Sequence, residues 1–127
     1  MLKKFCFIII VFFFHGSCIK EQTSPSYPIP SIPQNCDTSV INYAQIIRPL
    51  ILTNCNNAAA TSCHYSGTGN YDFGTYAVVA DRIRSGRFTE RILLPVNNPL
   101  HMPPFGEMNP CDKAKLLLWI NNGFPEN

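Results

Sequence analysis

The adjacent pair Cys63-His64 is the most chemically informative feature of this sequence. A cysteine followed directly by a histidine is typical of c-type haem attachment: the sulfur forms a thioether with a vinyl group, and the imidazole ligates the iron. The nearest upstream cysteine is Cys55, so the seven residues 56–62 separate the two cysteines, whereas the usual motif has two. Closing the longer loop costs only about 1 kcal/mol more. This spacing permits two thioethers, and a Cys55–Cys63 disulfide is the alternative.

A second candidate iron ligand lies in the segment His101-Met102-Pro103-Pro104. Electron-transfer haems often carry a methionine opposite the histidine. The prolines restrict the backbone and favour a loop that presents the Met102 thioether. His101 is an alternative ligand, which would give bis-histidine coordination; otherwise we expect it to be solvated in the loop. We expect Met108 to pack beside the last helix.

The N-terminus has the pattern of a secretory signal peptide: two lysines, the apolar run 5–14, and small residues before Cys18. The run is too short for a permanent membrane-spanning helix, which needs about 20 residues. We expect residues 1–17 to be removed and Cys18 to carry a lipid anchor, because the site resembles a bacterial lipobox, although His15 replaces the usual aliphatic residue. Ordinary cleavage between Ser17 and Ser24 is the alternative.

The exported chain is electrically balanced. The whole sequence has ten Lys and Arg and eight Asp and Glu, and two lysines leave with the signal, so 10 − 2 = 8 cations face 8 anions. With no basic stripe either, the sequence argues against a nucleic-acid partner. In an oxidising compartment, the four remaining cysteines could form two disulfides, or one disulfide and a cofactor site. These are Cys36, Cys55, Cys63 and Cys111.

Residues 18–35 are rich in proline, which prevents a helix and favours an extended tether. The globular domain is therefore expected at 36–127, and its pattern is helical with no competing strand signal. We expect a first helix over 41–52 that kinks or ends near Pro49, and irregular loops at 56–72 and 95–106. Thr75 should cap a second helix that Gly86 ends, and 88–94 adds a helical turn.

The last helix is the best signalled element of the domain. Asn109 is a good N-cap, Pro110 suits the first helical position, and Gly123 ends the helix. Its expected buried face is Leu116, Leu117, Trp119 and Ile120.

From Cys36 to Asn127 the chain resembles a bacterial family of short c-type cytochrome domains, common in exported proteins of Bacteroidetes and planctomycetes. The matching features are the apolar segment 46–55 that leads into Cys55, the Cys63-His64 pair, Tyr76 at the start of the next helix, the Met-Pro-Pro-Phe-Gly loop 102–106, and the closing helix with its tail, 111–127.

The resemblance implies a small all-α cytochrome c-like fold, with three to four helices around one covalent haem c. It implies His64 as the proximal ligand, Met102 as the distal ligand, and Cys55 with Cys63 as attachment points. Because the first and last helices of such folds pack together, a disulfide between Cys36 and Cys111 is expected.

The implied function is single-electron transfer without catalysis, since both axial positions of the iron are filled. The partners would be redox proteins of the bacterial cell envelope, and the lipid anchor would hold the exported chain at the membrane, facing the periplasm or the cell surface. One alternative is a haem-free, disulfide-stapled lipoprotein that acts as a binding module; another is a haem sensor or peroxidase whose Met102 leaves the iron. Four arginines are candidates for binding haem propionates, or for a solvated helix face: Arg82, Arg84, Arg87 and Arg91.

Overall fold

Residues 26–56 and 63–127 are described by the computed structural model of this chain. The expected signal peptide, the lipidation of Cys18 and the segment 57–62 lie outside the described residues. The described part is helical and contains no strand, which confirms the all-α prediction at that level. The elements are a π-helical turn η1 (Tyr43–Ile47), α1 (Arg48–Asn54), α2 (Tyr76–Arg84), α3 (Arg87–Leu93) and α4 (Pro110–Asn121).

The first helical segment changes its winding beside Pro49, where the sequence predicted a kink or an end, and the helix continues through the proline. Proline has no amide hydrogen, and its ring crowds the carbonyl of the residue four positions earlier, here Gln45. The turn before it is accordingly a wider π-turn, and α1 follows from Arg48. The amide of Cys55 donates to the carbonyl of Ile51 (2.8 Å), which places Cys55 at the end of α1.

The pair of helices α2 and α3 is joined at Gly86, whose φ of 77° lies in the left-handed region that favours glycine. Gly86 therefore ends α2, as predicted, and turns the chain into α3. Thr75 stands at the N-cap position of α2, but its side chain makes no capping hydrogen bond, so that detail of the prediction is wrong.

The last helix, α4, begins and ends where its local signals predict. The Asn109 side chain accepts a hydrogen bond from the amide of Cys111 (2.9 Å), and Gly123 follows the helix with a φ of 85°. The disulfide Cys36–Cys111 is present, with a Cα–Cα distance of 5.4 Å, so this pairing is confirmed. It ties the segment before η1 to the first turn of α4.

The hydrophobic core lies among η1, α1 and α4, with contributions from α2 and α3. Trp119 is 1% exposed and stacks on Tyr43 with ring centroids 5.5 Å apart. Its indole N–H donates to the carbonyl of Pro125 (2.9 Å), which folds the C-terminal tail over the core. Met108 is buried in the same cluster, as predicted.

Part of the predicted tether contacts the domain. The amide of Tyr27 donates to Asn121 Oδ1 (2.8 Å), and Asn121 Nδ2 donates back to the Tyr27 carbonyl (2.9 Å). Tyr27 and Ile29 are half-buried against the core. The segment 27–29 is therefore held against α4 instead of extending away from the domain.

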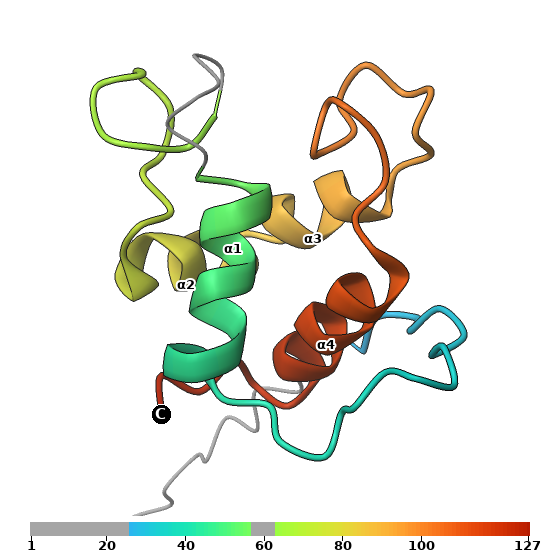
Figure 1. Ribbon diagram of the computed structural model, residues 1–127. Coiled ribbons are helices and arrows are strands. Elements are labelled where there is room, and N and C mark those ends of the chain that lie inside the picture. Colours follow the sequence, from blue (N-terminus) through green and yellow to red (C-terminus); the bar gives the residue numbers. More distant parts are fainter. Residues whose placement is uncertain (1–25, 57–62) are drawn as a thin grey trace, which may run out of the picture.

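Two long loops extend from the same end of the helical bundle (Figure 1). Residues 63–75 lead from Cys63 to α2, and residues 94–109 connect α3 to α4. These loops carry Cys63, His64 and Met102, whereas Cys55 directly follows α1.

Candidate functional site

The two loops, α1 and α3 enclose a partly open cavity of about 260 Å³. The four residues that the sequence predicts to bind a haem all line this cavity: Cys55, Cys63, His64 and Met102. They come from three separate segments, namely the end of α1, the loop after it and the loop before α4. Most of the remaining wall is apolar or aromatic, and includes Phe73, Phe88, Ile92, Pro103 and Pro104.

The two cysteines lie close together although seven residues separate them in the sequence. The amide of His64 donates to the carbonyl of Cys55 (2.9 Å), which closes the intervening segment at its base. Both thiols are free, so the alternative Cys55–Cys63 disulfide is not formed in the structure. Burial, and secondarily the charge of the Cys63 sulfur, raise the pKa of the Cys55 thiol to about 12. Cys55 is therefore a neutral thiol at physiological pH.

The His64 imidazole is held on two sides. Its ring stacks on Phe73, with centroids 4.1 Å apart and planes 11° from parallel. Its Nδ1 lies 3.1 Å from the Tyr71 carbonyl oxygen. Because a carbonyl only accepts, Nδ1 carries the proton in this hydrogen bond, and Nε2 keeps its lone pair. Partial burial lowers the pKa of His64, and the Tyr71 carbonyl opposes that shift only in part.

A histidine in this state is prepared to bind a metal ion. Metal-ligating imidazoles usually donate their second ring N–H to a carboxylate, water or backbone carbonyl, which fixes the tautomer and strengthens the ligand. Residue types alone did not predict the roles of Tyr71 and Phe73. A backbone carbonyl is available on any residue, so only the fold shows which one the imidazole meets.

Met102 reaches the cavity from the opposite loop. Its amide donates to the carbonyl of Arg91 (3.1 Å), and Arg91 Nη1 donates to the carbonyl of Leu100 (3.3 Å). Both bonds fasten the loop to the last turn of α3. The Met102 backbone is thereby held beside the cavity, whose wall includes Met102, Pro103 and Pro104.

His101 is not a solvated loop residue, and that expectation is wrong: it is 3% exposed. Its Nδ1 lies 2.7 Å from the Leu94 carbonyl, and its Nε2 lies 3.4 Å from the Gly106 carbonyl. It does not line the cavity. Because both ring nitrogens face backbone oxygens, His101 closes the loop that carries Met102 and offers no ring nitrogen to the cavity.

The four candidate arginines are not equivalent in the structure. Arg82, Arg87 and Arg91 line the cavity, whereas Arg84 lies outside it with its guanidinium 5.6 Å from the centre of the Phe124 ring. Among the described residues of the cavity wall there is no carboxylate. The site therefore combines an apolar interior with positive charge.

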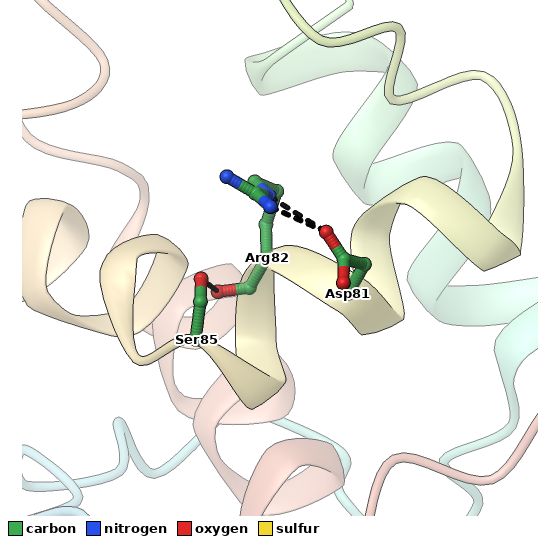
Figure 2. A network of polar contacts seen from close by, with 3 residues as sticks. All are labelled: Asp81, Arg82 and Ser85. Carbon is green, nitrogen blue, oxygen red and sulfur yellow. Dashed lines mark hydrogen bonds and ion pairs between the residues drawn. The ribbon is translucent and has the colours of Figure 1, made fainter.

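Arg82 already has two partners. Its guanidinium forms an ion pair with Asp81, shown in Figure 2 together with the Ser85 hydroxyl that donates to the Arg82 carbonyl. The same guanidinium lies over the Tyr71 ring, 4.1 Å from its centroid. Arg82 thus braces the loop that carries His64 against α2.

Within 26–56 and 63–127, no group of three or more His, Cys, Asp and Glu side chains could hold a metal ion. Across the same ranges, no helix has the length and apolar character needed to cross a membrane. Comparison with protein-family models, curated proteins and solved structures finds no match for this chain. The site is therefore interpreted from its own residues.

Proposed function

We propose that this chain is a c-type cytochrome that carries one covalently bound haem and transfers single electrons. The observation that supports it best is the convergence of Cys55, Cys63, His64 and Met102 on one cavity. These residues lie up to 47 positions apart in the sequence (102 − 55), and the sequence alone, through residue types and the family resemblance, had singled out each of them. Membership of the short bacterial cytochrome family, which the sequence resembles, is part of this proposal.

The donor set fits a haem and does not need a protein-only metal cluster. The porphyrin supplies four nitrogens to the iron, so the protein has only to provide an axial ligand on each face. His64 offers an Nε2 lone pair, and Met102 offers a soft thioether sulfur. Cys55 and Cys63 are free thiols that would hold the cofactor through thioether bonds.

The cavity is small and partly open. Its volume of about 260 Å³ is just below the range of roughly 300–1,000 Å³ that is usual for cofactor sites. Because the cavity is partly open, part of the flat ring would extend to the surface. An exposed edge is what outer-sphere electron transfer requires, since the partner protein must approach the conjugated system.

When bound, the haem would supply a one-electron couple, and the chain would set its properties. The Tyr71 carbonyl makes the His64 imidazole more basic, and the thioether of Met102 favours the reduced metal and raises the potential. The apolar wall of Phe73, Phe88 and Ile92 limits water around the site. If His64 and Met102 both held the iron, no position would remain for a substrate.

The proposed setting is the bacterial cell envelope. Residues 1–17 would direct export and then be removed, and lipidation of Cys18 would anchor the chain. Redox proteins of the envelope would be its electron donor and acceptor. The Cys36–Cys111 disulfide is compatible with an oxidising compartment.

The test is expression of the full chain in a bacterium with intact haem-ligation machinery. The purified protein should show the sharp reduced α-band of c-type haem, and mass spectrometry should find haem on a peptide that contains both Cys55 and Cys63. In Cys55→Ala and Cys63→Ala variants, one thioether remains and the α-band moves to longer wavelength, because one vinyl group stays unsaturated. Colourless protein with both thiols unmodified would refute the proposal and leave a haem-free binding module.

A further inference from the structure

Two arginines of α3 form the positively charged edge of the cavity. Arg87 and Arg91 are four positions apart on one helix, so their side chains lie on the same face, about 6 Å apart along the axis. Both line the cavity, beside the apolar residues Phe88 and Ile92 of the same helix. This edge therefore joins a hydrophobic surface to two guanidinium groups.

Neither guanidinium forms an ion pair within the described part of the chain. Arg87 is exposed, and Arg91 uses one Nη1 hydrogen bond for the Leu100 carbonyl, which leaves its other donors free. The nearest carboxylate in sequence, Glu90, is exposed and does not line the cavity. Asp81 of α2 does not line the cavity and is paired with Arg82.

We propose that Arg87 and Arg91 bind the two propionate carboxylates of the cofactor. The inference rests on the proposed function, since it names how the same cavity orients its haem. A ligand that is planar and apolar on one side and carries two carboxylates on the other matches this wall of aromatic residues and paired arginines. Guanidinium groups bind carboxylates through two parallel hydrogen bonds, which fixes orientation as well as adding energy.

The two arginines of α2 do not have the same free position at the cavity as Arg87 and Arg91. Arg82 is occupied by Asp81 and Tyr71, and Arg84 lies outside the cavity over Phe124. Arg84→Gln is therefore a matched control: it removes the same charge from a nearby exposed helix position without touching the cavity.

The experiment is a redox titration of the haem-loaded full chain at several pH values, at constant ionic strength. In Arg87→Gln the midpoint potential should fall at neutral pH, because an uncompensated carboxylate stabilises the more positive oxidised iron. The pH at which acidification begins to raise the potential should move upward, since a carboxylate without its cation binds protons more readily. Arg91→Gln loses the hydrogen bond to the Leu100 carbonyl but keeps the backbone bond from the Met102 amide to the carbonyl of residue 91. It should therefore shift both quantities in the same direction and retain the spectral signature of methionine ligation.

Arg87→Lys should restore most of the potential, because the charge is kept, and Arg84→Gln should leave both the potential and its pH profile unchanged. The proposal is overturned if Arg87→Gln and Arg84→Gln give the same values as the unmodified chain, or if both lower the potential equally. Wild-type protein without haem is a different result, because it refutes the proposed function itself. Circular dichroism of each variant confirms that the exposed substitutions leave the fold intact.

Discussion

The Cys36–Cys111 disulfide should contribute a large part of the stability of this small domain. The two cysteines are 75 positions apart, so the bond closes most of the described chain into one loop. In the chain-entropy relation, a loop of that length removes about 15 cal/mol/K from the unfolded state, or about 4 kcal/mol at 25 °C. Whole domains are stable by only about 5–15 kcal/mol.

The perturbation is the double variant Cys36→Ser with Cys111→Ser. An unfolding entropy of about 2.1 cal/mol/K per residue gives a total unfolding entropy of about 0.19 kcal/mol/K for a domain of about 90 residues. A loss of about 4 kcal/mol therefore corresponds to a fall of about 20 °C in the unfolding temperature. The assay is thermal and denaturant unfolding followed by circular dichroism, with and without a reductant.

The reductant provides an internal control for this reasoning. It should lower the stability of the unmodified chain to that of the double variant, and it should leave the double variant unchanged because Cys55 and Cys63 are free thiols. A double variant within about 1 kcal/mol of the unmodified chain would refute the loop-entropy argument. Further destabilisation of the double variant by reductant would reveal a second disulfide and contradict the proposed thioethers.

Met102→Ala should keep the covalent haem but lower the midpoint potential and abolish the long-wavelength band of sulfur-ligated ferric haem, whereas Met108→Leu, in the core, should change neither; potentiometry and absorption spectra decide. In protein made without haem ligation, the raised pKa of Cys55 should make its ionised fraction at pH 8 about a thousandfold smaller than that of a thiol with the ordinary pKa of 9.0. The stability that the neutral Cys55 thiol contributes is complete below pH 9 and is lost as the pH rises toward 12. Alkylation of Cys55 that reaches half its maximal rate below pH 10 would contradict the burial of this thiol. Asn121→Ala should cost about 1–2 kcal/mol and expose the segment around Tyr27 to protease, with exposed Asn122→Ala as the control.

The sequence predicts the helices well where a local signal determines them. Asn109 and Gly123 bound α4 because a capping side chain and a left-handed glycine act within one turn of the chain. Gly86 does the same between α2 and α3. Thr75 has the correct position without the predicted side-chain hydrogen bond.

The sequence also selects the residues that meet in the cavity, but it does not give their surroundings. The Cys63-His64 pair and Met102 are recognisable by type, whereas the stacking of Phe73 on His64 depends on how the loop returns after Asn70. His101 shows the limit most clearly. A histidine between a leucine and a methionine in a proline-rich loop looks solvated, and only tertiary structure reveals the two carbonyl oxygens that surround it.

The two histidines explain how loops at one end of a small domain can hold His64 and Met102, the proposed iron ligands, in fixed positions. Each closes the loop in which it lies: His64 bonds through its amide to Cys55 and through Nδ1 to Tyr71, and His101 faces the carbonyls of Leu94 and Gly106. The packed core is concentrated around η1, α1 and α4, and each loop contributes one buried side chain to it, Phe73 and Met108. The loops therefore gain their order from local polar contacts together with these two anchors. A cofactor attached to one loop and ligated by the other would therefore join two preformed halves, and the entropy lost on binding would be correspondingly small.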